Sequence, residues 1–368
     1  MLKFQYQKIT KMDVSVNMNK KQLIIMSLEP IESRYTKQWF TYLPEVFKKK
    51  LGEDYEVIQI NGKQKNNVVT EGAFLDFINT NIWKSEQLLE FFTYFNCNHI
   101  RNDAIILFTD AWNPCINQIK YTKELCKTNW TLIGIWHAGA YDPADFLGRI
   151  NDLTWAKSIE LGYYNALDIN WFATEFHKKL FLKTYGRDIF IDKTIISGFP
   201  MEYIADIDFT NVEKENLVVF PARMAPEKQP DIVKELEKQL PEYKFVYCCE
   251  EKMNKKQYHE TLAKAKVMIS VSLQETLGIT QCEGMSAKCI SLVPNRLSYT
   301  EMYSNESFVY PSIWSESFET ADFNNLKNLI KHSIDNYKDY LNIIEENFNY
   351  QLKNFFSCDK IIEKIKLL

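Results

Sequence analysis

Apolar and polar positions along the chain follow two different periods. Short apolar runs without a helical repeat occur at QLIIMSL (22–28), YEVIQI (55–60), DAIILFTD (103–110) and TLIGIWHA (131–138). The segments between them are longer and are predicted to be helices, as in RYTKQWFTYLPEVFKKKLG (34–52) and QIKYTKELCKT (118–128). A further unit covers residues 158–186 and is followed by KTIISGFP (193–200). Short buried strands separated by helices are typical of a parallel, doubly wound sheet.

The same alternation starts again near Asn216. Strands are predicted at LVVFPA (217–222), KFVYCCE (244–250), VMISVS (267–272) and ISLVP (290–294), with helices between them and a long helical region from about Asp322 to Leu368. We therefore predict an α/β protein with two Rossmann-like domains, residues 1–200 and 201–368. Ligands of such sheets bind outside the carboxyl ends of the strands, so we expect the site in a cleft between the domains.

The composition excludes several classes of protein. With 46% hydrophobic and 25% charged residues, the chain is globular rather than disordered. The formal net charge of −4 excludes a strongly basic nucleic-acid binder, although a local basic patch on the first half stays open. The eight cysteines include no C-x-x-C pair, so no zinc or redox motif is indicated. No apolar run has the length of a signal peptide or a membrane span, and we expect a cytoplasmic protein.

Two cations follow the first strand of the second domain. In FPARMAPEKQP (220–230), Arg223 and Lys228 lie in the loop that leaves this strand. A guanidinium can bind a phosphate through two parallel hydrogen bonds, and an ammonium adds a mobile point charge. The pair suits a diphosphate; the alternative is two solvated loop cations.

The segment QETLGITQCEG (274–284) contains two glutamates on either side of a predicted helix start near Gly278. The free N–H groups and the positive dipole end of such a helix form an anion site. Glu275 then lies in the loop before the helix, and Glu283 lies about one and a half turns inside it. A carboxylate at the second position can accept hydrogen bonds from ribose hydroxyls. The alternative is a pair of surface charges.

Taken together, these segments resemble the nucleotide-sugar half of GT-B glycosyltransferases, in particular the retaining family 4 that includes glycogen synthases and phosphatidylinositol mannosyltransferases. ETLGITQCEGMSA matches the family pattern E-x-[FL]-G-x-x-x-x-E-[AG]-M-[AS]-[AC]. ARMAPEKQPDIV matches G-R-[LM]-x-x-x-K-[GN]-x-x-x-[LIV], with Ala222 and Gln229 as departures. The match is close over residues 195–305, whereas the first domain matches only in its order of strands and helices.

The resemblance implies a GT-B fold whose C-terminal helix packs back on the first domain. It also implies a metal-independent hexosyl- or pentosyltransferase without a cofactor, which uses a UDP- or GDP-sugar as donor with retention. Its expected roles are Arg223 and Lys228 at the diphosphate, Glu275 at the sugar and Glu283 at the ribose. The backbone N–H groups offered to the donor are those of Leu277, Gly278, Ile279 and Thr280. No D-x-D motif occurs where a metal-dependent transferase carries one.

Residues expected beside the acceptor come from the first domain. In IWHAGAYDPADFLGR (135–149), His137 follows a strand, and in the resembled family a histidine at this place lies beside the donor sugar and the acceptor. Asp142 or Asp145 can orient or deprotonate an acceptor hydroxyl. The alternatives are a packed histidine, a turn before Pro143 and a helix cap at Asp145.

The loop SLEPIESRYTKQWF (27–40) departs from the family, which carries a glycine-rich loop there. Charged and aromatic residues replace the glycines, and the expected acceptor-binding residues of this loop are Glu29, Arg34, Tyr35 and Trp39. A second strand end, FTDAWNP (108–114), adds Asp110 to this set. The motif E-P-I-E-S-R-Y-T-x-Q-W, together with W-H-A-G-x-Y-D-P later in the chain, resembles phage-encoded transferases that modify hydroxymethylated pyrimidines in DNA.

This second resemblance implies duplex DNA as a partner, within the host cytoplasm. The acceptor base is then extruded from the helix, and Arg34, Lys37 and Lys48–Lys50 contact phosphates. The alternatives are a glycan or lipid head group as acceptor, a GT-B nucleotide-sugar 2-epimerase, and a binding protein without turnover.

Overall fold

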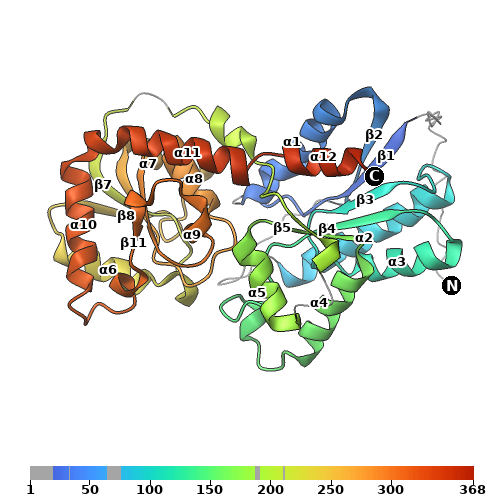
Figure 1. Ribbon diagram of the computed structural model, residues 1–368, viewed down its shortest axis with the longest axis horizontal. Coiled ribbons are helices and arrows are strands. Elements are labelled where there is room, and N and C mark those ends of the chain that lie inside the picture. The colour runs from blue at the N-terminus through green and yellow to red at the C-terminus, as the bar shows by residue number, and fades with distance from the viewer. Residues whose placement is uncertain (1–19, 33, 64–75, 187–190, 210–211) are drawn as a thin grey trace, which may run out of the picture.

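The computed structural model describes residues 20–32, 34–63, 76–186, 191–209 and 212–368. Two parallel sheets lie side by side along the long axis of the molecule, one in each half of the chain (Figure 1). Residues 1–19, for which we predict no signal segment, lie outside the described residues. Among the described helices, none has both the length and the apolar character needed to cross a bilayer.

The first sheet has the order β2-β1-β3-β4-β5-β6, and every neighbouring pair is parallel. Its strands are β1 (Lys21–Met26), β2 (Tyr55–Ile60), β3 (Ile105–Phe108), β4 (Thr131–Ile135), β5 (Ile169–Phe172) and β6 (Thr194–Ile196). The helices are α1 (Tyr35–Leu51), α2 (Phe77–Asn96), α3 (Cys115–Cys126), α4 (Thr154–Ala166) and α5 (Glu175–Tyr185). The strand β5 falls inside the segment 158–186, which the sequence pattern did not divide.

Helices cover both faces of this sheet because its strands are apolar on both sides. Along β1, Leu23 and Ile25 pack in one core cluster with Trp39 of α1. Ile24 and Met26 point the other way, into a second cluster that includes residues of α2 to α5. Strands buried on both faces read as continuous apolar runs, which is the pattern observed in QLIIMSL.

The second sheet has the order β11-β10-β9-β7-β8 and is also parallel. Its strands are β7 (Glu215–Phe220), β8 (Lys244–Tyr247), β9 (Ala265–Ile269), β10 (Ile290–Pro294) and β11 (Val309–Tyr310). The helices are α6 (Pro230–Gln239), α7 (Lys255–Lys264), α8 (Ile279–Ser286), α9 (Tyr299–Met302), α10 (Phe323–Asp335), α11 (Leu341–Phe355) and α12 (Asp359–Lys366). The predicted α/β class with two parallel sheets is confirmed.

The C-terminal helix crosses back to the first half, as predicted. In Figure 1, α11 runs along the second sheet and α12 continues beside α1 and β2. Asp359 forms an ion pair with Lys50 at 2.7 Å. The Tyr55 hydroxyl donates to the Ile365 carbonyl at 3.1 Å. The first sheet therefore has one covering helix from each end of the chain.

Two backbone segments meet where the chain passes between the halves. Phe199 N–H donates to the Phe355 carbonyl, and Met201 N–H donates to the Phe356 carbonyl, both at 2.8 Å. Gly198, one residue earlier, has a φ of +65°, and a Cβ there would collide with the Phe355 backbone. Glycine in the tract SGFP therefore permits this close crossing.

Candidate active site

The two loops that carry the donor motif meet at the carboxyl ends of β7 and β9. Lys228 ends a 3-10 helix (Pro226–Lys228) and is 8% exposed. Its ammonium donates to the Gln274 carbonyl and lies 3.5 Å from Glu275 Oε2. The structure thus brings Lys228 and Glu275 together across 47 positions of sequence, and both side chains are largely buried.

The helix α8 begins where the sequence predicts, with Gly278 as its N-cap residue. A Cβ at Gly278 would lie 3.0 Å from the Tyr299 ring, so the loop packs closely against α9. The Gly278 N–H faces the Met302 sulfur at 3.5 Å, and the Ile279 N–H donates to the Leu277 carbonyl at 2.8 Å. Two of the four predicted N–H groups, those of Gly278 and Ile279, therefore have partners within the protein.

Glu283 lies on α8 and is 3% exposed. Its carboxylate accepts from Lys255 Nζ at 2.7 Å and from the Tyr258 hydroxyl at 3.0 Å. Both donors come from α7, and neither was predicted from the sequence. Their spacing of three positions places them on one face of the helix, which is the signal that could have found them. They fix the orientation of the carboxylate proposed for the ribose.

Both ring nitrogens of His137 are used within the protein. Nε2 lies 2.7 Å from the Thr109 carbonyl, so it carries the proton. Nδ1 is then the acceptor of the Tyr35 hydroxyl at 2.6 Å. Burial lowers the pKa of His137, although Asp110 opposes this. The ring is therefore neutral and is not placed to take a proton from an acceptor.

The main chain of the same histidine joins the two halves of the site. The Thr276 hydroxyl donates to the His137 carbonyl at 2.8 Å. Thr174 Oγ1 donates to the Thr276 carbonyl at 3.1 Å. Thr276 follows Glu275 directly, so the donor loop is tied to the first half at two points. The family pattern accepts any residue at this position, so Thr276 was not predicted as part of the site.

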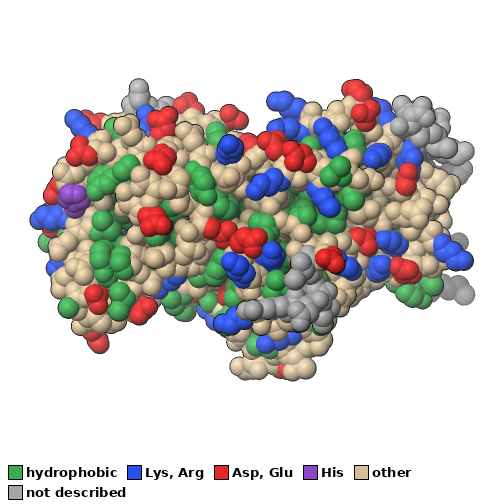
Figure 2. Space-filling model, viewed as in Figure 1, with side chains coloured by type: hydrophobic (Ala, Val, Ile, Leu, Met, Phe, Trp, Pro, Cys, Tyr) green, Lys and Arg blue, Asp and Glu red, His purple; other side chains and the backbone are tan. Residues whose placement is uncertain are grey.

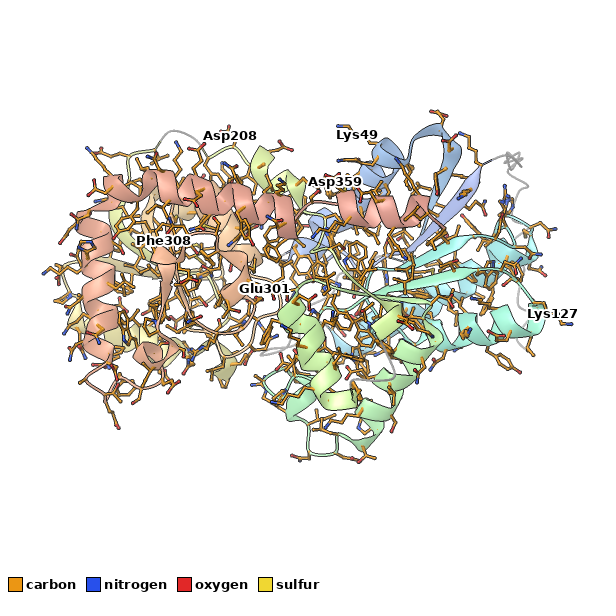
Figure 3. All side chains as sticks on the ribbon, in the orientation of Figure 1. Lys49, Lys127, Asp208, Glu301, Phe308 and Asp359 are labelled. Carbon is orange, nitrogen blue, oxygen red and sulfur yellow. The ribbon has the colours of Figure 1, made fainter. Side chains whose placement is uncertain are left out.

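A carboxylate from the second half also caps a helix of the first half. Glu301 lies at the junction of the two halves (Figure 3). It accepts from the N–H groups of Glu175 and Phe176 at 3.1 and 2.7 Å, at the start of α5. Negative charge at a helix N-terminus is favourable, so this contact stabilises the relative placement of the two sheets.

Asp142 and Asp145 are both buried in the loop after β4. Asp142 accepts from the Ala144 N–H at 3.0 Å, and Asp145 accepts from the Leu147 N–H at 3.1 Å. The Asp142 contact is the turn of the alternative interpretation, whereas the N-cap residue of the following 3-10 helix (Leu147–Arg149) is Phe146 and not Asp145. Burial raises the pKa of Asp142, and it raises the pKa of Asp145 to about 6.

This loop is held from below by Glu160 of α4, which is fully buried. The carboxylate accepts from the N–H groups of Ala140 and Tyr141 at 2.9 and 3.1 Å. It also accepts from Trp112 Nε1 and the Tyr185 hydroxyl, both at 2.5 Å. Burial raises the pKa of Glu160 to about 7, and the four donors oppose that shift. Glu160 was not predicted as part of the site.

Three of the predicted acceptor-binding side chains are engaged with the protein. Trp39 is 1% exposed, and its indole N–H donates to the Pro200 carbonyl at 2.6 Å. Glu29 accepts from Thr80 Oγ1 at 2.7 Å, and burial raises its pKa. Asp110 pairs with Lys84 at 3.2 Å. In this conformation Trp39 offers no surface to a ligand.

Arg34 lies near Arg223. Burial and, to a lesser extent, the like charge of Arg223 lower the pKa of Arg34 to about 10. Arg223 itself pairs with Glu227 at 3.0 Å. Tyr35, the next residue in the chain, reaches His137 instead. Of the predicted acceptor set, Arg34 therefore lies near Arg223, and Tyr35 contacts His137.

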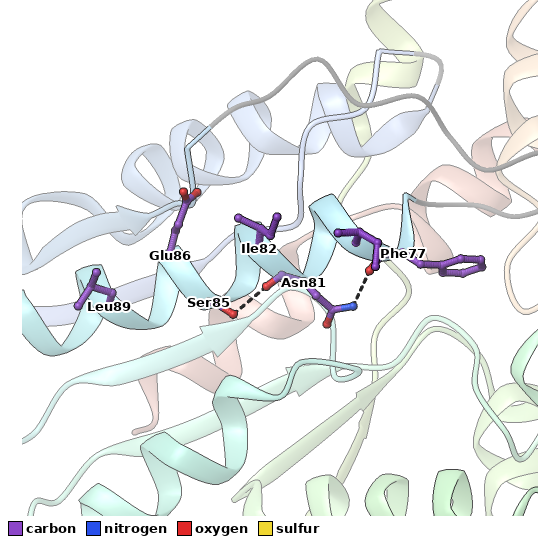
Figure 4. A pocket seen from close by; sticks show the side chains of 7 residues that line it. Phe77, Asn81, Ile82, Ser85, Glu86 and Leu89 are labelled. Atoms are coloured by element: carbon purple, nitrogen blue, oxygen red, sulfur yellow. Dashed lines mark hydrogen bonds between the residues drawn. The ribbon is translucent and has the colours of Figure 1, made fainter. Parts of the chain in front are cut away.

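A separate hollow of about 470 Å³ lies along α2 (Figure 4). Phe77, Ile78, Ile82 and Leu89 contribute to its lining, with Glu86 as its one ionisable group. Without a cation, this hollow does not suit a diphosphate. Within the described residues, no group of three or more His, Cys, Asp or Glu side chains is arranged to hold a metal ion.

Comparison with known proteins gives similarity in structure alone. No family model and no curated protein sequence matches the chain. The catalytic domain of starch synthase IV from Arabidopsis thaliana, bound to ADP and acarbose, has a TM-score of 0.59 at 12% identity, over 95% of this chain and 98% of that one. HepE from Anabaena, in complex with UDP and glucose, has a TM-score of 0.56 at 12% identity with the same coverage.

Two further solved structures extend the same result. Sucrose-phosphate synthase from Thermosynechococcus elongatus has a TM-score of 0.58 at 10% identity, over 95% of this chain and 98% of that one. TarM has a TM-score of 0.52 at 14% identity, and the match covers 77% of this chain but only 58% of TarM. The chain therefore has the GT-B fold, which confirms the predicted architecture.

Proposed function

We propose that the protein transfers a sugar from a UDP- or GDP-sugar to an acceptor hydroxyl, with retention and without a metal ion. The observation that carries the proposal is the meeting of Lys228 and Glu275, 3.5 Å apart, beside the first turn of α8. A cation for the diphosphate and a carboxylate for the sugar thus stand together at strand ends, where ligands of this fold bind.

The proposed roles follow from charge and position. Arg223 and Lys228 stabilise the negative charge that develops on the diphosphate as the bond to the anomeric carbon breaks. Glu283, held by Lys255 and Tyr258, accepts from the ribose hydroxyls. Solved GT-B neighbours in complex with UDP and with UDP-glucose support a donor of this kind.

On the acceptor side, Asp142 is the better candidate for a base than His137. Both nitrogens of the histidine are hydrogen-bonded, whereas burial raises the pKa of Asp142 towards the range useful for proton transfer. We assign His137 a positioning role, through its contacts with Tyr35 and with the Thr276 hydroxyl.

The test begins with a thermal-shift screen of nucleotides and nucleotide sugars, with and without EDTA. A ligand at a hundred times its Kd stabilises the folded state by about 2.7 kcal/mol, which is a shift of several degrees. For the nucleotide that raises the Tm of the wild type, Arg223→Ala should lose binding. Glu275→Gln should keep binding and lose both transfer and slow hydrolysis of the donor. Lys238→Ala, a surface lysine of α6, is the control.

If neither UDP nor GDP stabilises the wild type, the donor is misassigned. Full turnover by Glu275→Gln would remove that residue from the sugar site. Activity that disappears with EDTA and returns with a divalent cation would contradict metal independence.

As acceptor we propose a hydroxymethylated pyrimidine in DNA, on the sequence resemblance of the loop 27–40. Lys48 and Lys49 are exposed at the end of α1, which suits phosphate contacts, whereas Lys50 is paired with Asp359. On the face shown in Figure 2, basic and acidic side chains are interspersed, so this face has no continuous basic strip. The test incubates hydroxymethylated and plain duplexes with a panel of sugar nucleotides. If a glycan or lipid head group gains the mass of a sugar and neither duplex does, DNA is not the acceptor.

A further inference from the structure

Two arginines from opposite halves of the molecule converge on one buried carboxylate. Arg149 ends a 3-10 helix (Leu147–Arg149) of the first half, and its Nη1 lies 3.1 Å from Glu227 Oε2. Arg223 of the second half places its Nη2 3.0 Å from Glu227 Oε1. The Glu227 side chain is only 4% exposed, so the two guanidiniums cover it from both sides.

Each guanidinium has more hydrogen-bonding capacity than this contact uses. A guanidinium carries five N–H donors, and the contact with Glu227 uses one from each arginine. The side chains of Arg149 and Arg223 are 37% and 33% exposed, so part of each reaches solvent. The planar fork of arginine fits phosphate oxygens as well as it fits a carboxylate.

Four cations, Arg34, Arg149, Arg223 and Lys228, lie among carboxylates at this place. Arg34 comes close enough to Arg223 for the like charge to lower its pKa, and Lys228 follows Glu227 directly. Cations held together repel one another unless an anion compensates them. The carboxylates nearby are those of Glu227, Glu275, Asp142 and Asp145, of which the last two feel Lys228 and Arg223 respectively.

We propose that Arg149 binds the diphosphate of the donor together with Arg223, and that Glu227 holds both guanidiniums in place while the donor is absent. The inference rests on the proposed function, because it concerns the same donor. It adds a contribution from the first half to a site whose sequence motifs lie entirely in the second. The competing explanation is that the salt bridges only fasten the two halves together.

The experiment measures Kd by calorimetry for UDP and GDP and, in parallel, for uridine and guanosine. Arg149→Ala should weaken binding of the nucleoside diphosphate roughly 10- to 100-fold, because it removes a charge-assisted contact to phosphate. Binding of the nucleoside should stay unchanged, and Arg149→Lys should recover part of the loss. Lys120→Ala, which removes a first-half cation from a surface pair with Glu124, should leave both affinities as in the wild type.

Glu227→Gln separates the two explanations even if Arg149→Ala folds poorly. The amide keeps the shape and removes the competing charge, so the nucleoside diphosphate should bind more tightly than to the wild type. Weaker binding to Glu227→Gln, with a loss for the nucleoside equal to that for the diphosphate, would show a fastening role and overturn the inference.

Arg223→Ala in the same series distinguishes the inference from the proposed function. If Arg223→Ala weakens diphosphate binding and Arg149→Ala does not, the role of Arg149 is refuted and the donor site stands. If neither substitution affects it, the diphosphate site itself is wrongly placed.

Discussion

The buried histidine of α5 makes the stability of the fold sensitive to acid. His177 is fully buried, and the Tyr141 hydroxyl lies at its Nε2. The Phe172 ring packs against it edge-on at 5.1 Å. Burial lowers the pKa of His177 to about 3, because an imidazolium there would lose its hydration. The ring is therefore neutral in the folded protein throughout the mildly acidic range.

The direction and size of the effect follow from proton linkage. In the unfolded chain a histidine titrates near pH 6.5. Between pH 6.5 and about 3 the unfolded state binds a proton that the folded state does not, so the free energy of unfolding falls as the pH falls. The slope approaches 1.4 kcal/mol per pH unit, and the loss from pH 7 to pH 5 is about 2 kcal/mol.

The assay is urea unfolding of the wild type and His177→Gln at pH 7 and pH 5. The glutamine oxygen can still accept from Tyr141, and the side chain does not titrate. His177→Gln should be less stable at pH 7 but should lose about 2 kcal/mol less than the wild type on going to pH 5. His332→Gln, at an exposed position on α10, is the matched control and should keep the wild-type dependence. Equal losses in the wild type and His177→Gln would refute the reasoning.

Three further substitutions test the local geometry. Gly198→Ala should destabilise the fold by more than about 2 kcal/mol in chemical denaturation, since it combines a positive φ with a collision at Phe355. Gly162→Ala, in open space on α4, should stabilise the fold by roughly 0.5–1 kcal/mol. Equal effects of the two substitutions would contradict the crossing geometry. Glu160→Gln should cost about 1–3 kcal/mol at pH 8, because its NH₂ group cannot accept from the Tyr141 N–H, and should speed amide exchange in residues 139–142; unchanged exchange there would count against Glu160 as the support of the loop.

The parts of the fold that could be predicted from sequence depend on local patterns. Strands buried on both faces give apolar runs, and the order of such runs with helices determines a doubly wound sheet. The strand β5 was hidden because it has four residues, INWF, between two amphipathic helices. The two-residue strand β11 gave no periodic signal at all. Short strands are defined by their neighbours in the sheet, and those neighbours are distant in sequence.

The same distinction applies to the site. Lys228, Glu275 and Glu283 could be proposed because each lies in a continuous motif with a recognisable spacing. The contact of Tyr35 with His137 joins residues 102 positions apart, and that of Arg149 with Glu227 joins residues 78 positions apart. Neither pairing has a spacing that a sequence pattern can reveal. The sequence therefore indicated which charged residues of the second half are candidates for the site, but not the partner with which each is paired.

Those partners determine what donor binding must do. Lys228 is paired with Glu275, Arg223 with Glu227, and Lys255 with Glu283. A diphosphate that binds as proposed replaces carboxylates as the partner of Lys228 and Arg223, so the gain from each new contact is the difference between two ion pairs. Separating a buried pair leaves one charge uncompensated, which is costly unless a new partner takes its place. Under the proposed roles, release of Glu275 from Lys228 is linked to arrival of the phosphate, and we expect donor binding to make this carboxylate available to the sugar.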